Sequence, residues 1–476
     1  MLTFFLIGAI FIPLIGSFFC LLFPEKVREW WAVGIVALSF VFLLFLLAPV
    51  LKLTSIQADI LSFRGNYFSF SFFADGISLV FALIFSFIGL VALIYSVPYM
   101  KEYENQREYY FMTCLMVASL IGVSFSKNLV LFYVFWEVAA LTTWRLVGFY
   151  REEKIVWIAD KTFLMTFLGS SFMLMGFTLL YVQTGTLDLF QLKEVNLVNV
   201  NIPLFLIFLG VIAKSAILPL HTWLSDAHPV APSPMSAILS GVEVEVGLLG
   251  FLRIFVWMTG VSWSWILTLA VISSLIGAGA ALLEKDIKRI IAYSTVSQVG
   301  YILIGFALLK ETGIIAGLLY FMIHAIAKAS LFLGAGVVER KYGTRDIREL
   351  GGLMQTSSVF GIGFLFSVFS IAGFPPFGGF YAKLMVIMSA VEEGHFWVAT
   401  FAIVAAIFTM LYLFRLFNGI FMGKSKKTTS GGGSFAGEKL MVGCVVLLGA
   451  ISLAIGFFIG QVLGLPAAAV AGILTK

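Results

Sequence analysis

Residues 314–338 read IIAGLLYFMIHAIAKASLFLGAGVV, an apolar run long enough to cross a membrane as one helix. Its only charged or basic side chains are those of His324 and Lys328, near the middle of the run. A charge at the bilayer centre costs about 2.5–3.5 kcal/mol on the insertion scale, so such residues face the protein interior and mark ion paths. The run therefore predicts a transmembrane helix that carries a buried ionisable site.

The rest of the chain has the same character. Of its 476 residues, 61% are hydrophobic and 12% are charged, whereas a soluble domain carries about 25% charged residues. This composition excludes a soluble globular enzyme, a disordered chain and a nucleic-acid binder. We predict an all-α polytopic membrane protein with about 14 transmembrane helices. The first span, residues 2–23, has no basic N-terminal region and no cleavage site, so we expect a retained helix.

Basic residues alternate between the predicted loops. The loops after spans 1, 3, 5, 9, 11 and 13 hold sixteen Lys and Arg, whereas the opposite loops hold five. The positive-inside rule places the first set in the cytoplasm, with both termini outside the cytoplasmic (inner) membrane. The segment 424–434, KSKKTTSGGGS, predicts a flexible cytoplasmic loop. The longest external loops, about 51–72 and 184–201, are too short for a soluble domain.

Further ionisable residues stand near the middle of predicted spans. They are Glu137, Lys214, Glu243, Glu245 and Lys383. Such groups can pass protons when water joins them at a shared depth. In the alternative, each charge pairs with a neighbour and only fixes helix packing. Buried pairs rarely stabilise a fold by themselves, which favours the relay.

Spacing decides which of these groups can act together. On a helix of 3.6 residues per turn, side chains two apart point about 200° apart, so Glu243 and Glu245 cannot both face one pathway. His324 and Lys328 are four apart and share one helix face. We therefore expect this face to be the better relay site.

Charges near span ends have simpler explanations. Arg145, Lys161 and Arg415 lie within a turn or two of a cytoplasmic end and are expected to snorkel to water. Arg253 lies toward the outer end of the eighth span, where it either snorkels or pairs with a glutamate. Asp75 opens the third span and is expected to cap its N terminus.

Prolines interrupt two predicted spans beside a buried lysine. Pro219 follows Lys214 in the seventh span, and Pro375 and Pro376 precede Lys383 in the twelfth. Proline breaks the helical ladder, and the freed carbonyls then need protein or water partners. We predict that helices 7 and 12 are discontinuous around an ion path; the alternative is an ordinary proline kink.

The two broken spans are five apart, which is an odd number. Two five-helix units in tandem would therefore have opposite orientations in the membrane, as in an inverted repeat of spans 4–8 and 9–13. The predicted divisions are N-terminal helices 1–3 (residues 1–106), the first repeat (107–259), the second repeat (260–422), and the flexible loop with helix 14 (423–476).

Several long motifs follow one another along the chain. They are LFYVFWEVAALTTW (131–144), AKSAILPLHTWLSDAHPVAPSPMSAILSGV (213–242), EKDIKRIIAYSTVSQVGYI (284–302), HAIAKASLFLGAG (324–336) and FPPFGGFYAKL (374–384). In this order they resemble the antiporter-like subunits shared by respiratory complex I, multi-subunit Mrp sodium/proton antiporters and membrane-bound hydrogenases. The resemblance implies fourteen core helices, inverted repeats, and discontinuous helices 7 and 12.

The resemblance also implies roles for individual residues. Glu137 would be the glutamate of helix 5 and Lys214 the lysine of helix 7, and this ion pair would act as a switch by separating. His324 would be the histidine of helix 11 with Lys328 beside it, and Lys383 would be the lysine of helix 12.

One position departs from the family pattern. The family commonly has a lysine in helix 8, in a stretch similar to GVMIKTG, whereas this chain reads GVEVEVG and places Glu245 there, with Glu243 as a second acid. An acid in place of a cation reverses the charge between the two halves. This change either suits sodium, which needs oxygen ligands, or marks a subunit whose channel is altered.

We expect an ion-translocating subunit, for protons or Na⁺/H⁺ antiport, in a multi-subunit and redox-driven complex. Its candidate residues are Glu137, Lys214, Glu245, His324, Lys328 and Lys383, with His221, Glu243 and Arg253 as secondary candidates. The alternatives are a stand-alone solute transporter, a structurally retained subunit with an altered channel, and a haem or quinone subunit. A haem would need paired axial histidines, and only His324 is clearly mid-span.

No cofactor is expected in this chain, and no catalytic chemistry of its own. Cys20, Cys114 and Cys444 are far apart in the sequence and give no iron–sulfur or zinc spacing, so redox centres are expected on partner subunits. The expected partners are other membrane subunits, including further antiporter-like ones, together with the lipid bilayer and H⁺ or Na⁺. No nucleic acid is expected.

Overall fold

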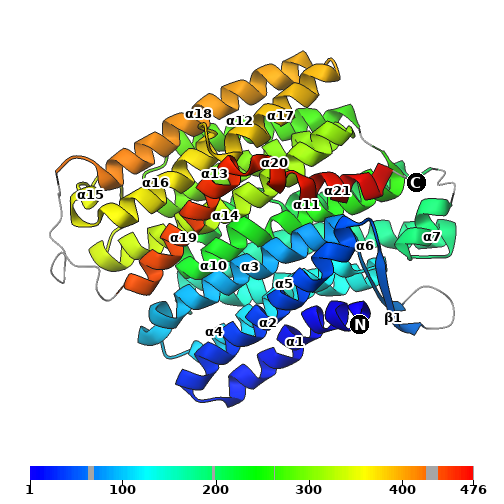
Figure 1. Cartoon of the computed structure of the whole chain (residues 1–476), viewed down its shortest axis with the longest axis horizontal. Helices are drawn as coiled ribbons and strands as arrows, with labels where there is room; N and C mark the ends of the chain where they lie inside the picture. Colours follow the sequence, from blue (N-terminus) through cyan, green and yellow to red (C-terminus); the bar gives the residue numbers. More distant parts are fainter. Residues whose placement is uncertain (63–68, 196–198, 262, 425–437, 475–476) are drawn as a thin grey trace.

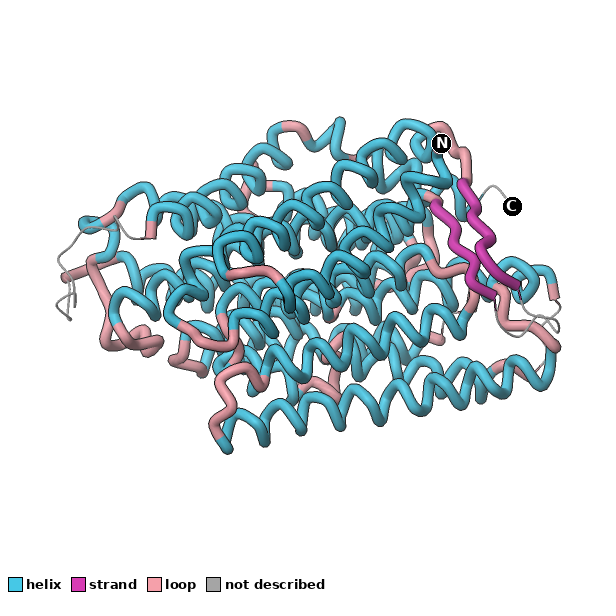
Figure 2. The backbone as a smooth tube through the Cα atoms, turned by 90° about the horizontal axis from the view of Figure 1, so that it is seen from below, coloured by secondary structure: helices cyan, strands magenta, loops and turns pink. Residues whose placement is uncertain are grey.

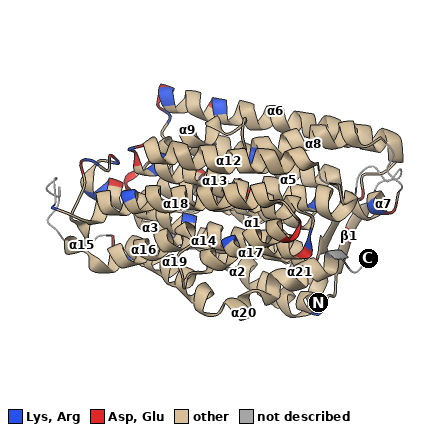
Figure 3. Ribbon diagram, turned by 90° about the horizontal axis from the view of Figure 1, so that it is seen from above, with Lys and Arg blue, Asp and Glu red and all other residues tan. Residues whose placement is uncertain are grey.

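Long apolar runs form a bundle of helices whose two ends are polar. The computed structural model describes residues 1–62, 69–195, 199–261, 263–424 and 438–474 (Figure 1). The N and C termini lie at the same end of the bundle (Figure 1). Figure 3 shows most basic and acidic residues gathered at the opposite end, where the predicted cytoplasmic loops lie.

The first part of the chain contains six long helices and a small sheet. The elements are α1 (Leu2–Leu22), α2 (Glu25–Leu51), β1 (Ile56–Ser62), β2 (Ser69–Ala74), α3 (Gly76–Tyr99), the 3₁₀ turn η1 (Met100–Glu102), α4 (Gln106–Phe125), α5 (Leu129–Val147), α6 (Glu153–Thr184) and the short α7 (Leu189–Glu194). Large apolar side chains on the outer faces of α1, α2 and α6 are exposed, as expected for contact with lipid.

The second part of the chain contains the interrupted helices. The elements are α8 (Asn201–Lys214), α9 (Thr222–Val230), α10 (Ser233–Ile238), the π-helical η2 (Leu239–Glu243), α11 (Glu245–Phe251), the π-helical η3 (Leu252–Thr259), α12 (Ser264–Leu283), α13 (Ile287–Ala307), α14 (Glu311–Tyr342), α15 (Leu353–Thr356), α16 (Ser358–Ala372), α17 (Gly378–Glu392), α18 (Phe396–Phe421), α19 (Lys439–Phe457), α20 (Ile459–Val462) and α21 (Gly464–Leu474).

Twelve helical spans within the described ranges are long and apolar enough to cross a membrane. The other two predicted spans are divided. Residues 202–222 contain α8 and the break that precedes α9, and residues 357–391 contain α16 and α17. Proline lies in each break, where it cannot supply the backbone donor that a continuous helix needs. The division into two inverted repeats stays a prediction.

A β-hairpin stands where the sequence analysis predicted only an external loop. Strands β1 and β2 pair antiparallel at the end that holds both termini (Figure 2). Its strand pattern is short and lies beside a long apolar run, which hid it. The helix that follows, α3, begins at Gly76, and Asp75 caps it: Ser78 N–H donates to Asp75 Oδ1 over 2.9 Å. The predicted cap is confirmed.

Candidate functional site

The eighth span contains two π-helical segments around its acidic residues. From Ser233 to Thr259 its most apolar window is fully buried in the bundle. Glu243 ends the first π segment, and Glu245 begins the α-helical turn between the two segments. π-Helical turns are rare and occur frequently at functional sites, because they redirect side chains and leave backbone groups free.

Lys214 and Glu243 form an ion pair in the core. Lys214 is the last residue of α8, so its side chain leaves the helix where the hydrogen-bond ladder ends. Its Nζ donates to Glu243 Oε1, and the two side chains are 2% and 1% exposed. Thr143 Oγ1 donates to the same oxygen over 2.9 Å. The lysine also lies 5.6 Å from the centre of the Trp136 ring.

Glu137 does not pair with Lys214, so the ion pair implied by the family resemblance is absent from the described residues. Glu137 lies half-buried on α5, and its buried Oε1 has no hydrogen-bond partner in that part of the chain. Glu243 of η2 is the partner of Lys214 instead of Glu137, because α11, which follows η2, packs against α8. Glu137 stays within electrostatic range of Lys214.

Glu245 faces the other way, toward α14. Its Oε1 lies 2.8 Å from His324 Nδ1, and both side chains are fully buried. Neither atom is aligned for a hydrogen bond within the described structure. As their spacing predicts, Glu243 and Glu245 therefore serve different neighbours. The eighth span thus places Glu243 beside Lys214 in the first half of the chain and Glu245 beside His324 in the second half.

Lys328 is held by groups of α13. Its Nζ donates to the Ile291 carbonyl over 3.0 Å and to Ser294 Oγ over 2.5 Å. Tyr412 donates its hydroxyl to Ser294 Oγ over 2.6 Å. His324 and Lys328 lie one turn apart on α14, as predicted, and both are fully buried.

Lys383 ends the line of ionisable groups. It is 4% exposed, and its Nζ donates to the Ile371 carbonyl over 2.8 Å, at the end of α16 just before the break. Its Nζ also lies 5.2 Å and 5.6 Å from the ring centres of Tyr301 and Tyr320. Tyr320 donates its hydroxyl to Gln298 Oε1.

Polar side chains that the sequence analysis passed over connect Lys328 to Lys383. Gln298 Nε2 donates to Tyr412 over 3.3 Å and to Thr409 over 3.2 Å. With Ser294 and Tyr320, these residues bridge the two lysines. The signal was the polar run STVSQVGY at 294–301, inside an otherwise apolar span. We call the whole set the axial line: Lys214, Glu243, Glu245, His324, Lys328, Lys383 and these bridging residues.

The structure does not bring His221 or Arg253 to the axial line. His221 lies in the break after α8, where its Nδ1 is 3.3 Å from the Pro219 carbonyl. Arg253 is 2% exposed and contacts both oxygens of Asp75, over 2.5 and 2.7 Å. It neither snorkels nor pairs with a glutamate, because the cap of α3 supplies an aspartate that is itself 23% exposed.

The three basic residues expected to snorkel have protein partners. Arg145 pairs with Glu108, and Lys161 pairs with Asp226 over 2.7 Å. Arg415 donates to the Ala281 carbonyl over 3.0 Å. These charges lie near the basic end of the bundle, where acidic side chains and helix ends supply acceptors that the sequence alone did not locate.

The described ranges contain no group of three His, Cys, Asp or Glu residues arranged to hold a metal ion. Cys20, Cys114 and Cys444 are free and buried. The expectation that redox centres lie on partner subunits remains a prediction.

Comparison with known proteins identifies the family. Residues 126–409, more than half of the chain, match the family model described as "NADH:quinone oxidoreductase/Mrp antiporter, TM". Residues 61–111 match the model of the N terminus of NADH-ubiquinone oxidoreductase (complex I) chain 5. Together the two matches include every acidic and basic residue of the axial line and strand β2 of the hairpin.

Relatives from two kinds of complex are similar to the chain. An Na(+)/H(+) antiporter subunit of Alkalihalophilus pseudofirmus is 36% identical over 424 residues, which cover 82% of this chain and 52% of the relative. NADH-ubiquinone oxidoreductase chain 4 of Chondrus crispus is 33% identical over 432 residues, covering 87% of this chain and 86% of the relative. The chain thus spans about half of the length of the antiporter relative.

Two solved assemblies contain chains with the same fold. A chain of the Mrp complex from Dietzia sp. DQ12-45-1b has a TM-score of 0.91 at 24% identity, covering 100% of this chain and 98% of that one. A chain of an archaeal membrane-bound sulfane sulfur reductase has a TM-score of 0.86 at 24% identity, with 98% of each chain covered. The chain belongs to the family of antiporter-like membrane subunits shared by NADH:quinone oxidoreductases and Mrp antiporters.

Proposed function

We propose that the chain is an ion-translocating subunit, for protons or Na⁺/H⁺ antiport, of a multi-subunit membrane complex driven by a redox reaction elsewhere. The axial line carries this proposal. Six ionisable side chains are buried in the bundle: Lys214 contacts Glu243, Glu245 contacts His324, Lys328 binds Ser294, and Lys383 lies beside the Tyr320 ring. Burying each of these charges costs several kcal/mol, so packing alone does not explain why the bundle contains so many of them.

Each part of the axial line has a chemical role in this proposal. The Lys214–Glu243 pair holds the proton of the first half, and Glu245 passes charge from helix 8 to His324. Lys328 and Lys383 hold the protons of the second half, with the Ser294, Tyr412, Gln298 and Tyr320 side chains between them. Hydroxyl groups both donate and accept and so can pass a proton, whereas the Gln298 amide orients the Tyr412 and Tyr320 hydroxyls on either side of it.

The arrangement in the membrane follows from the basic end. We propose that this end faces the cytoplasm and that both termini lie on the outer side, in the cytoplasmic membrane. The partners are other membrane subunits, because relatives of this chain are named as subunits of NADH-ubiquinone oxidoreductase and of Na(+)/H(+) antiporters. Such partners carry any redox centres.

Ion flux in the assembled complex tests the proposal. The complex is purified with the full chain, placed in liposomes, and assayed with a fluorescent pH probe inside, with Na⁺ or with choline outside. Lys383→Met removes the terminal ionisable group of the axial line, and Glu137→Gln tests the unpaired carboxylate of α5. The matched control is Lys310→Met, because Lys310 is 56% exposed and pairs with Glu393 at the surface.

We expect Lys383→Met to assemble and to lose at least about tenfold in proton flux, since a positioned proton carrier contributes about 10²–10⁴-fold. Lys310→Met should keep the wild-type rate. Equal flux in wild type and Lys383→Met would show that the axial line carries no ions, and wild-type flux in Glu137→Gln would show that this carboxylate of α5 takes no part. A difference between Na⁺ and choline identifies the exchanged cation.

One observation favours a second function, that of a structurally retained subunit. Lys214 is held by Glu243 in a buried pair, and a dry pair of this kind can serve packing alone. In that case the complex would transport ions through its other subunits, and neutralising this pair would leave flux unchanged. The double variant described in the Discussion separates the two functions.

A further inference from the structure

A cavity opens at the basic end of the bundle, between α9, α13 and α14. Its volume is about 640 Å³, enough for many waters. We call it the vestibule. Its lining includes Tyr150, Pro229, Ala231, Lys288, Glu339 and Arg345. Its walls therefore come from several predicted cytoplasmic loops and helix ends.

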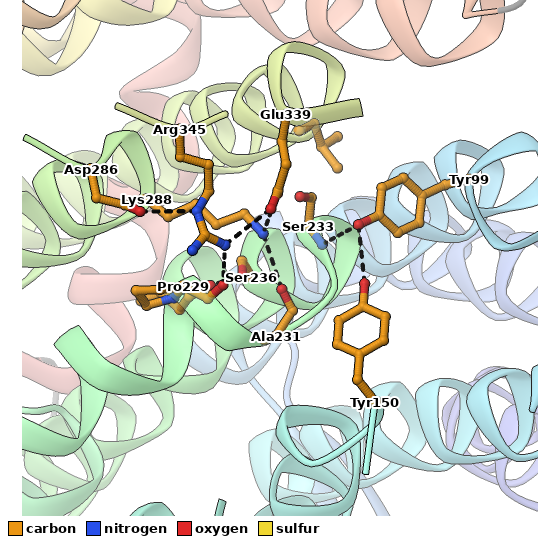
Figure 4. Close-up of polar contacts among 12 residues, drawn as sticks. Tyr99, Tyr150, Pro229, Ala231, Ser233, Ser236, Asp286, Lys288, Glu339 and Arg345 are labelled. Atoms are coloured by element: carbon orange, nitrogen blue, oxygen red, sulfur yellow. Dashed lines mark hydrogen bonds and ion pairs between the residues drawn. The ribbon is translucent and has the colours of Figure 1, made fainter. Parts of the chain in front are cut away.

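Lys288 forms the deep wall of the vestibule. It is 2% exposed, its Nζ donates to the Ala231 carbonyl over 3.1 Å, and it pairs with Glu339 over 2.9 Å (Figure 4). Arg345 also contacts Glu339, over 3.0 Å, and Asp286. The vestibule is thus lined by a buried ammonium group that is bound to the Ala231 carbonyl and to Glu339.

His228 is buried next to residues that line the vestibule, since Pro229 follows it in the chain. It stands three residues before Ala231, at the end of α9, and is fully buried. Its ring stacks on Phe332 of α14, with centres 4.2 Å apart and planes at 17°. Neither ring nitrogen has a hydrogen-bond partner among the residues that the structure describes. A buried imidazole with two free nitrogens is costly and calls for a function or a water partner.

One face of α14 leads from the vestibule to the axial line. Glu339 and Gly336 line the vestibule, Phe332 lies against His228, and Lys328 belongs to the axial line. These residues are three or four apart, so they share a face over about 16 Å of helix.

The facing helix α13 has the same order. Lys288 lies in its first turn, and the Ile291 carbonyl that accepts from Lys328 is three residues further on. The charges of Lys288 and Lys328 both act on the His228 ring.

We propose that His228 carries protons between the vestibule and Lys328. A proton delivered through vestibule water adds to one ring nitrogen, and the other nitrogen then releases its proton to the neutral Lys328 amine. One proton moves inward and the ring returns to its neutral form. The inference rests on the proposed function, since it supplies the axial line with protons from the basic end.

Two substitutions separate proton transfer from packing. His228→Phe keeps a ring against Phe332 but cannot hold a proton, and His228→Ala leaves a space beside the vestibule that free imidazole can enter. We expect both to assemble and to lose about a hundredfold in proton flux, in the range of a positioned proton carrier. His395→Phe is the matched control, because His395 is partly exposed between α17 and α18.

Chemical rescue is the decisive measurement. Added imidazole should restore the flux of His228→Ala at least tenfold, and should not change His228→Phe, in which the space is filled. A structural role alone would not respond to imidazole. Wild-type flux in both variants, or a loss in His228→Ala that imidazole does not restore, would overturn the inference while leaving the proposed function in place.

A second measurement holds even if the wild-type complex transports no ions, which would refute the proposed function. Histidine C2 hydrogens exchange with deuterated water only where water reaches the ring, and mass spectrometry reports each residue. We expect His228 of the wild-type complex to exchange within about tenfold of the partly exposed His395. If His228 fails to exchange, water does not reach it and the proton carrier is refuted.

Discussion

The Lys214–Glu243 pair can be altered in two ways that should differ in outcome. Glu243→Gln removes one charge and leaves the ammonium of Lys214 buried, with 2% of its side chain exposed. The double variant Lys214→Met/Glu243→Gln removes both charges at nearly constant volume. The amide of the introduced glutamine also keeps an oxygen for the hydroxyl of Thr143, which now donates to Glu243 over 2.9 Å.

The expected energies differ by several kcal/mol. Removing one member of a buried ion pair costs about 3–5 kcal/mol, whereas replacing both members by neutral groups of similar size is neutral or stabilises by about 1–4 kcal/mol. For a chain of 476 residues, an unfolding entropy of about 2.1 cal/mol/K per residue converts the single-variant loss into a fall in Tm of about 3–5 °C. The double variant should unfold at or above the wild-type temperature.

Thermal unfolding of the purified complex, followed by tryptophan fluorescence, measures this difference, and liposome assays measure flux in the same samples. We expect the double variant to be stable and assembled but to lose transport through this chain. If it unfolds as early as Glu243→Gln, the pair is not the electrostatic unit described here. If it is stable and transports at the wild-type rate, the pair serves packing only.

Three further predictions concern other sites. Asp75→Asn should destabilise the complex by about 3–5 kcal/mol, because it leaves Arg253 buried and unpaired; an unchanged Tm would contradict this. Glu245→Lys should alter the dependence of flux on Na⁺ concentration, and an identical sodium titration would count against a role in cation choice. In the exposed loop after α14, hydrogen bonds from Arg348 lower the pKa of Asp346 to about 2. The stability from this contact should be present above about pH 4 and lost as the pH falls through 2. The carboxylate infrared signal that Asp346→Asn removes reports the ionisation behind it and should fade with a midpoint near pH 2.

The sequence predicted a helical membrane fold correctly, because the length of an apolar run and the place of a proline are local properties. Apolar length sets a span, and proline removes the donor that a continuous helix needs. Asp75 was predicted as a cap from its place before an apolar run, and the structure confirms it. The face shared by His324 and Lys328 followed from helical spacing alone.

The partners of the buried charges were beyond such reasoning. Lys214 binds Glu243 and not Glu137. The choice of partner depends on how the end of α8 packs against the eighth span, Ser233–Thr259. The π-helical turns of the eighth span were also hidden, since no residue pattern in the stretch GVEVEVG distinguishes a π-helical turn from an α-helical one. His228 was not among the candidate residues of the sequence analysis, and only the packing of α9 on α13 and α14 shows that it is enclosed.

The lysines of the axial line differ in what holds them. Lys214 binds a carboxylate, an attraction that exists only while the amine is charged. Lys383 binds the Ile371 carbonyl, and Lys328 binds the Ile291 carbonyl. A neutral amine retains hydrogens to donate, so these two bonds outlast deprotonation. The Ile371 carbonyl, left unpaired by the interrupted helix, thus holds Lys383 in both of its protonation states. Lys383 can therefore release and regain a proton while its amine stays at the same position.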